Sequence, residues 1–521
     1  MFKGHPKGLI WAALSNMGER FGYYIMNAVL VLFLCSKFGL SDDTAGMIFS
    51  VFYFMIYIMA LPGGIVADKL QNYKGTIAAG LIVMAVGYVM LSIPTTVTPE
   101  SKTAMLVLIC AALLIITVGN GLFKGNLQAI VGQMYDNLEA EAAKKGPEDL
   151  AEAQSKRDPG FQIFYVFINL GGVFAPFVAP AIRKWWLGRF GMTYNSDLPA
   201  VCHQYLNGTA DDTQMANLTT WMTENNSNFD PSNMADACTS YLEVFNTGVH
   251  YSFIASVAAM LLSLCIFIIT KKMYPTPAKK EKKEVVNYTA EERAAMAKDI
   301  KQRMVGLYAV LGIVIFFWFS FHQNTQSLTI FTRNFVNSDQ VAPEVWQFLN
   351  PFLVIVLTPI IMWLFNTPWG RKFSTPKKIA LGMGFAACAY IFLTIFSMMV
   401  GYPSGKMFMA QPAADIAAQK CGAWVLIVTY FFLNVAELFI SPLGLSFVSK
   451  IAPKHLQGIC QGLWLGATAL GNLIIFLGVR MLNSFSHLWY TWFVFAAICI
   501  IAMAVMFGML KWLERITSQQ Q

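Results

Sequence analysis

The sequence predicts an all-α membrane protein with twelve transmembrane helices arranged as two six-helix bundles. Three observations lead to this fold class. Of the 521 residues, 56% are hydrophobic and only 13% are charged, about half the charged share of a soluble domain. The hydrophobic residues stand in uninterrupted runs of the ~20 residues that cross a bilayer. A polar, basic stretch in the middle of the chain separates the first six runs from the last six.

The hydrophobic runs define the spans. In chain order we expect membrane helices near residues 8–36, 43–67, 75–95, 103–135, 160–183, 249–270, 303–333, 344–365, 379–401, 421–447, 458–482 and 488–511. Several exceed the length needed to cross a bilayer, so tilt or extension beyond it is expected. No cleavable leader is expected before the first span. The composition excludes a disordered chain, a disulfide-stapled secreted module and a soluble multidomain enzyme.

The predicted domains follow from these spans. Residues 1–183 and 249–270 are assigned to an N-terminal six-helix bundle, 184–248 to an extracytoplasmic loop segment, 271–302 to a cytoplasmic linker, 303–512 to a C-terminal six-helix bundle and 513–521 to a cytoplasmic tail. The linker starts rich in proline and lysine and is expected to end as an amphipathic helix. Its polarity favours a solvated connection between the bundles.

Lysine and arginine predict the orientation. Most of the 37 basic residues fall in segments that lie inside if the N-terminus is cytoplasmic, and the densest group is Lys271–Arg303. The positive-inside rule therefore places both termini in the cytoplasm. The net charge of +8 is then a topology signal, and no nucleic-acid partner is expected. We expect a monomer in the lipid bilayer of a bacterial inner membrane.

The external segment 184–248 carries two cysteines, Cys202 and Cys238, whereas the other seven cysteines lie in or beside apolar spans. A cysteine inside an apolar span usually behaves as a small hydrophobic residue. A Cys202–Cys238 disulfide is possible and would need an oxidising exterior such as the bacterial periplasm.

Five ionisable side chains interrupt the spans: Glu19, Arg20, Lys124, His322 and Glu437. A charge at such a depth costs a few kcal/mol, so it normally faces a wet cavity or a partner. Glu19 and Arg20 are about 100° apart around a helix, so we expect Lys124 to be the counter-charge of Glu19. Buried pairs that only fix the helix register are the alternative, but they are weak evidence of stabilisation.

His322 is followed by a polar run, residues 323–327, that lipid could not face. We therefore expect this run to line a cavity and His322 to be a candidate protonatable switch; a hydrogen-bonded core histidine is the alternative. Tyr23, Tyr24 and Tyr57 stand in mid-span beside the charged group, where their hydroxyls are expected to form hydrogen bonds. Glycine pairs such as Gly119 and Gly121 indicate close helix approach.

The sequence contains no motif of a hydrolase, a metal site or a Walker A loop. Without a nucleotide site, transport would depend on an ion gradient or on the gradient of the substrate itself. We therefore expect a protein that is not an enzyme, with no metal and no cofactor. A sensor that signals through residues 271–303 is a weaker alternative, because no long cytoplasmic domain is present.

Several motifs carry a family resemblance. Gly63-Gly64-Ile65-Val66-Ala67-Asp68-Lys69 resembles the loop motif between spans two and three of the major facilitator superfamily. Glu19-Arg20-Phe21-Gly22-Tyr23-Tyr24 resembles the end of the ExxERFxYY motif of proton-coupled oligopeptide transporters, the POT/PTR family. Further matches in family order are Gly119–Asn126, Phe164–Gly171, Phe317–Leu328, Leu349-Asn350-Pro351 and a stretch from Glu437 to Trp464.

The resemblance implies a bilobed bundle that imports di- or tripeptides by proton symport through alternating access, with protons as the coupling ion. Carried over by position, the substrate-binding residues would be Arg20, Tyr23, Tyr24, Asn27, Tyr57, Lys124, Asn169, His322, Asn350, Glu437 and Trp464. Proton coupling and gating would fall to the five intramembrane ionisable residues. A small peptide is a zwitterion, so Lys124 would take its carboxylate and Glu437 its amine, which suits rocking around a midplane site.

Three positions depart from the family pattern. Asn16 replaces the first glutamate of the motif, Asn27 replaces an arginine, and His322 replaces a glutamate in span seven. The last two changes remove one positive and one negative charge together. The loss of two carboxylates leaves open a same-fold transporter of another small solute, such as nitrate, an organic anion or an amino acid derivative, with altered or absent proton coupling.

Overall fold

The structure is a computed structural model that describes residues 4–275, 290–337, 341–368, 370–452 and 457–518. These residues form helices joined by short connections, and apart from three isolated β-bridges the described chain contains no strand pairing. Within this part, twelve helices are long and apolar enough to cross a membrane. They overlap the twelve predicted spans one for one, which confirms the predicted fold class.

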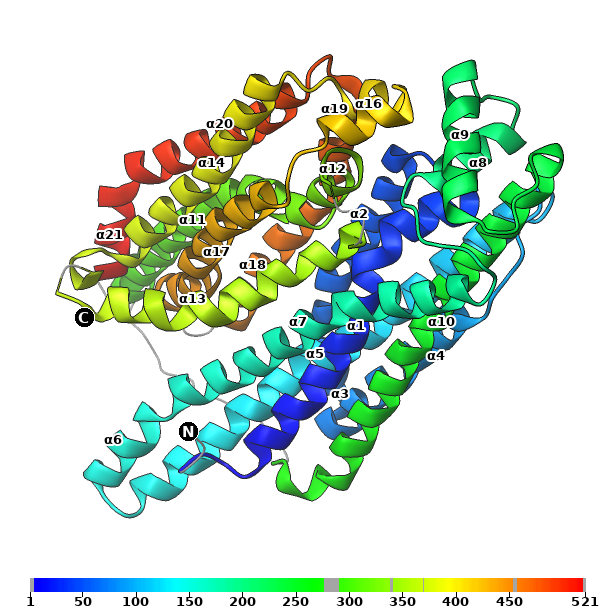
Figure 1. Cartoon of the computed structure of the whole chain (residues 1–521). Helices are drawn as coiled ribbons and strands as arrows, with labels where there is room; N and C mark the ends of the chain where they lie inside the picture. Colours follow the sequence, from blue (N-terminus) through cyan, green and yellow to red (C-terminus); the bar gives the residue numbers. More distant parts are fainter. Residues whose placement is uncertain (1–3, 276–289, 338–340, 369, 453–456, 519–521) are drawn as a thin grey trace. The chain divides into compact units, whose positions relative to one another are not determined.

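The chain folds into two compact units. The first contains the described residues of Met1–Ala278, Leu328–Phe352 and Lys406–Gly422. Its main helices are α1 (Gly8–Phe38), α2 (Asp42–Ile58), α3 (Ala60–Leu70), α4 (Tyr73–Ser92), α5 (Lys102–Ala143), α6 (Pro147–Ser155), α7 (Arg157–Gly188), α8 (Leu198–Leu206), α9 (Asp212–Asn225), α10 (Met234–Ile269) and α12 (Ser327–Phe335), with shorter turns η4 (Pro343–Phe348), α15 (Gly405–Met409) and α16 (Ala413–Gln419) (Figure 1). Helix α1 packs against both α7 and α10, and α4 packs against α5.

The second unit is built from the remaining described residues of the second half of the chain. Its helices are α11 (Ala290–Phe321), α13 (Leu349–Asn366), α14 (Thr375–Val400), α17 (Trp424–Ile451), α18 (Gln457–Leu473), α19 (Phe476–Ser484), α20 (Leu488–Gly508) and α21 (Leu510–Ser518). Helix α14 packs against α17 and α20. Part of the predicted linker, 276–289, lies outside the described residues, and from Ala290 the chain is helical. The predicted domain limits stay a prediction.

Local sequence signals set the tight turn between the first two spans. Helix α1 ends at Phe38 and is capped by Gly39, whose φ of 59° lets its N–H reach back to the carbonyl of Cys35. Glycine adopts this left-handed conformation without strain. Ser41 then caps α2 by accepting a hydrogen bond from the N–H of Thr44. Asp42 in the first turn of α2 complements the positive end of the helix dipole.

Glycines allow α3 to lie directly on α5. A Cβ added at Gly63 would stand 2.0 Å from the carbonyl oxygen of Gly121, and one added at Gly121 would stand 2.3 Å from that of Met59. Asn126 fixes this contact, since its side-chain amide donates to the carbonyl of Gly63 at 3.1 Å. The glycines of this region therefore serve backbone approach between membrane helices, as predicted from the sequence.

This contact predicts opposite outcomes for two neighbouring substitutions. We expect Gly63→Ala to lower the thermal stability and yield of the detergent-purified protein sharply, because its Cβ meets the backbone of α5. Gly64→Ala is the matched control: no heavy atom lies within 4 Å of its added Cβ, and alanine favours a helix over glycine by about 1 kcal/mol. Equal melting temperatures for the two variants, measured by fluorescence-detected size exclusion, would contradict the packing described.

The predicted external loop 184–248 contains two helices. Helix α8 and helix α9 pack side by side beyond the ends of the long helices of the first unit (Figure 1). We call residues 189–233 the α8–α9 segment. The sixth span was expected from residue 249, but α10 begins at Met234. Its added turns carry buried side chains, including Cys238 and Tyr241, and the helix packs on α8, so tertiary contacts extend it past the apolar run.

Candidate functional site

A buried ion pair lies on helix α1 inside the first unit. Glu19 on α1 is fully buried and accepts two hydrogen bonds from the guanidinium of Arg20, from Nε and Nη2, each at 2.6 Å. Asn120 on α5 donates a third hydrogen bond to Glu19 at 2.8 Å. A bidentate pair of this kind fixes both side chains and is the strongest geometry for a carboxylate and an arginine.

This geometry corrects the expected pairing of Glu19 with Lys124. Arg20 is next to Glu19 in sequence, but its long side chain bends back along α1 and reaches the carboxylate. Asn120 occupies the side of the carboxylate that faces α5, and Lys124 lies one turn further along the same helix. The Lys124 ammonium instead stands 4.7 Å from the centre of the Tyr57 ring, a cation–π contact.

The predicted tyrosines extend this cluster. The guanidinium of Arg20 lies 4.5 Å from the centre of the Tyr23 ring, and the Tyr23 hydroxyl donates to Asn27 at 3.1 Å. Tyr24 contacts Tyr23 edge to face, with ring centres 5.4 Å apart. The structure therefore brings together seven of the predicted residues in the first unit: Glu19, Arg20, Tyr23, Tyr24, Asn27, Tyr57 and Lys124.

Two predicted residues of the first unit lie apart from these contacts. Asn169 on α7 is buried, and its side-chain amide donates to the carbonyl of Tyr165 in the same helix at 3.0 Å. Asn350 stands in the first turn of α13, whose first residues up to Phe352 belong to the first unit, and is half-buried. Near it, a Cβ added at Gly172 of α7 would stand 3.1 Å from the ring of Pro351.

In the second unit, His322 stands at a break in the seventh span. A short 3₁₀ turn, His322–Asn324, separates α11 from α12. His322 is buried, its Nδ1 lies 2.5 Å from Oδ1 of Asn472 on α18, and its ring stacks on Trp318 with centres 4.9 Å apart. Because the carbonyl of an amide accepts hydrogen bonds, this contact favours a proton on Nδ1.

The first residue of the polar run after His322 is held by hydrogen bonds within its unit. Gln323 and Gln326 are fully buried. Gln323 donates to the carbonyls of Phe319 at 3.0 Å and Ile475 at 3.2 Å, and it accepts a hydrogen bond from Ser327. The Gln323 side chain therefore satisfies backbone groups around the helix break, as a polar side chain in a membrane helix must, and the cavity-lining interpretation of the polar run stays a prediction.

The remaining predicted residues lie on two further helices of the second unit. Glu437 on α17 is half-buried. Trp464 on α18 is 3% exposed and covers Gly444, where an added Cβ would stand 2.0 Å from its ring. The cluster around Arg20, Lys124 and Glu19 thus has a formal charge of +1, and Glu437 provides a negative charge on the second unit.

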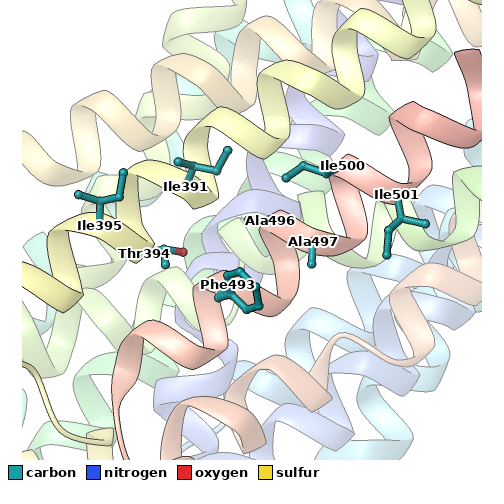
Figure 2. A pocket seen from close by; sticks show the side chains of 8 residues that line it. All are labelled: Ile391, Thr394, Ile395, Phe493, Ala496, Ala497, Ile500 and Ile501. Carbon is teal, nitrogen blue, oxygen red and sulfur yellow. The ribbon is translucent and has the colours of Figure 1, made fainter.

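A pocket of about 350 Å³ on the second unit lies between α14 and α20 (Figure 2) and is separate from these clusters. It is lined by Ile391, Thr394, Ile395, Phe493, Ala496, Ala497, Ile500 and Ile501. Apart from the Thr394 hydroxyl, this lining is hydrocarbon, and both helices are long enough to cross the membrane. The pocket offers no group for the charges of a zwitterion.

Two site residues were not predicted from the sequence: Asn120 and Asn472, the amide partners of Glu19 and His322. Each is a polar residue within an otherwise apolar run, and this was the available signal.

A buried contact between a lysine and a histidine at one end of the first unit was also not predicted from the sequence. Lys37 on α1 donates to the carbonyl of Thr95 and contacts Nε2 of His250, both at 2.6 Å.

His250 completes this contact at the end of α4. Its Nδ1 lies 2.5 Å from the carbonyl oxygen of Leu91. Leu91 stands in the last turn of α4, where the final carbonyls of a helix have no partner within it. His250 and Lys37 therefore satisfy carbonyls at and just beyond the end of this helix, a role for which basic side chains are suited.

These observations define a polytopic helical membrane protein with ionisable side chains within the spans of both units. The chain belongs to the POT family: the sequence model of that family matches residues 74–291 and 279–493.

Individual relatives agree with this membership. The peptide transporter YePEPT of Yersinia enterocolitica is 25% identical over 493 residues, covering 91% of this chain and 87% of the relative. Dipeptide and tripeptide permease A of Escherichia coli is 26% identical over 483 residues, covering 90% and 83%. A crystal structure of a peptide transporter POT in complex with sulfate matches with a TM-score of 0.69 at 20% identity, covering 99% and 97%, which shows the shared fold.

Proposed function

We propose that this protein is a secondary transporter that imports di- and tripeptides together with protons by alternating access. Membership of the POT family and the activities named for its relatives support the proposal. The observation that carries it is the pattern of charge within the spans: a net positive cluster around Lys124 in one unit and Glu437 in the other. A peptide zwitterion requires one group of each sign, and charges at this depth are typical of substrate and proton pathways.

Within this proposal each charged residue has a role. Lys124 takes the peptide carboxylate, because the described residues offer its ammonium an aromatic ring and no carboxylate in ion-pair contact. Glu437 takes the peptide amine. Glu19 is the proton acceptor of the first unit, since protonation would release Arg20 from the pair. His322 is a second protonatable group in place of the family glutamate, because histidine is the side chain that can serve as a physiological switch.

The remaining parts of the proposal concern the protein as a whole. We propose that both termini lie in the cytoplasm, that the protein is a monomer of the bacterial inner membrane, and that protons are its only coupling partner, without cofactor or metal. The basic residues of Lys271–Arg303 support this orientation. On this view the protein catalyses no covalent reaction.

Uptake into liposomes tests the proposal. We expect the purified protein to accumulate a labelled dipeptide faster under an inward proton gradient than without one, and unlabelled di- and tripeptides to compete. Peptides capped at both ends should compete poorly, because neither charge is then available to Lys124 or Glu437. An absence of dipeptide uptake would contradict the proposal.

A second cargo has one observation in its favour. Asn16 on α1 is buried and stands where the family motif has a carboxylate, and His322 replaces another. Fewer acids favour a solute that is less cationic, such as nitrate or an organic anion. The same uptake assay, run with a panel of these anions, separates the two: competition by an anion and not by dipeptides would establish the second cargo.

A further inference from the structure

Two cysteines meet where α8 lies on α10. Cys202 in α8 and Cys238 in the first turns of α10 are both 0% exposed, and each holds a free thiol. Helix α8 packs on α10, and the two thiols are close enough to affect the ionisation of Cys202. Two cysteines that are far apart in sequence, excluded from water and carried by packed helices are candidates for a disulfide.

Neighbouring contacts hold the two helices in this register. Tyr241 lies one turn beyond Cys238 on the same face of α10, and its hydroxyl donates to the carbonyl of Thr193 at 2.9 Å while accepting from the N–H of Asn195 at 3.1 Å. The Asn195 side chain then accepts from the N–H groups of Asp197 and Leu198, at 2.8 and 3.0 Å, at the start of α8. The chain leading into α8 is therefore anchored to α10 beside the cysteines.

We propose that Cys202 and Cys238 form a disulfide that staples the α8–α9 segment to α10. The bond forms by exchange with a dithiol–disulfide carrier on the non-cytoplasmic side: one sulfur–sulfur bond forms between the cysteines and one breaks in the carrier. The carrier takes both electrons and both thiol hydrogens and leaves as a dithiol. This inference rests on the orientation in the proposed function, which places α8 outside the reducing cytoplasm.

The ionisation of the Cys202 thiol in the folded protein indicates when the disulfide forms. Burial, together with the nearby Cys238 thiol, raises the pKa of the Cys202 thiol well above its ordinary value. The thiolate is the species that attacks a disulfide, so exchange is slow once α8 has docked. The bond therefore forms while the segment folds, and afterwards it resists external reductants in the native protein.

The staple also fixes the contacts that the α8–α9 segment makes with other parts of the first unit. Asp197 at the start of α8 receives the Lys420 ammonium at 3.4 Å. On α9, Asn217 donates to the carbonyl of Gln411 at 2.9 Å and accepts from the N–H of Ala413 at 2.7 Å. A covalent bond within residues 202–238 limits the unfolded chain and so favours the docked segment.

Thiol counting on the full-length protein tests the proposal. Cells that express the chain in their membrane are quenched in acid, and the protein is denatured, alkylated with a maleimide and weighed. The sequence has nine cysteines, so we expect seven adducts without reduction and nine after it, because one disulfide removes two thiols. Peptide mapping should join the fragments that contain Cys202 and Cys238.

Single cysteine variants identify the two thiols that the disulfide removes from the count. Cys202→Ser and Cys238→Ser should each give eight adducts without reduction, since the remaining partner becomes free. Cys110→Ser is the matched control on α5 and should give six, because it leaves the pair intact. Nine adducts in the unreduced wild type, or a bond mapped to other cysteines, would overturn the proposal.

The same preparation is assayed for dipeptide uptake, which separates the two proposals. Active uptake with nine free thiols would contradict the disulfide alone. Seven adducts in a protein that takes up no peptide would contradict the proposed cargo and leave the disulfide established.

Discussion

Replacing Glu19 by glutamine is expected to abolish dipeptide uptake driven by a proton gradient and to preserve the exchange of labelled for unlabelled peptide. Glutamine keeps the size of the side chain and can still contact Asn120, but it cannot gain or lose a proton. Arg20 then no longer alternates between a paired and a released state. Driven uptake and counterflow in proteoliposomes measure the two activities separately.

The exchange assay is also the folding control for this variant. Loss of the Glu19 carboxylate leaves the Arg20 guanidinium, which is 5% exposed, without its counter-charge. A buried pair broken on one side costs about 3–5 kcal/mol, so the melting temperature should fall. Asn120→Leu is the matched control variant. It removes one hydrogen bond from the Glu19 carboxylate but keeps that carboxylate as a proton site. Driven uptake that survives in Glu19→Gln would exclude Glu19 as the coupling group.

The second large effect is expected at a buried pair in the first unit. Arg183 on α7 donates to Glu344 in η4 at 2.6 Å, and the two side chains are 2% and 0% exposed. Arg183→Met leaves the Glu344 carboxylate buried and uncompensated, so we expect a loss of about 3–5 kcal/mol. Thermal unfolding of the purified protein, followed by intrinsic fluorescence, measures the change.

Two further variants test whether the loss of stability comes from an unpaired charge and whether it depends on burial. Arg183→Met combined with Glu344→Gln removes both charges, and its melting temperature should recover towards the wild type, because replacing a complete buried pair is often close to neutral. Arg157→Gln breaks contacts with Asp136 and Glu139 at a more exposed site, where such pairs contribute about 0–1 kcal/mol. Equal destabilisation by Arg183→Met and Arg157→Gln would contradict the role of burial.

The spans were predictable because membrane helices are set by the length and composition of local runs. Each predicted run has its helix in the structure. The sequence predicts a loop for the α8–α9 segment because its residues are polar. A local signal was present: Asp211 and Gln214 form a capping box at the start of α9, a spacing typical of helix N-termini.

Side-chain partners were harder to predict than helices. The angle between Glu19 and Arg20 on a helical wheel suggested separate partners, but side-chain length outweighed that angle. The contact of His322 with Asn472 joins residues from different helices, and nothing in a single sequence identifies such a contact. Local rules therefore located the ionisable residues, while their pairing depended on tertiary packing.

The end of α4 has a consequence for how many groups can carry a mobile proton. The carbonyl of Leu91 can only accept a hydrogen bond, so His250 must hold its hydrogen on Nδ1, which leaves the lone pair of Nε2 directed at the Lys37 ammonium. A second hydrogen on that ring would confront a cation 2.6 Å away. His250 is thus locked as one neutral tautomer, which leaves His322 as the histidine available for coupling among these two.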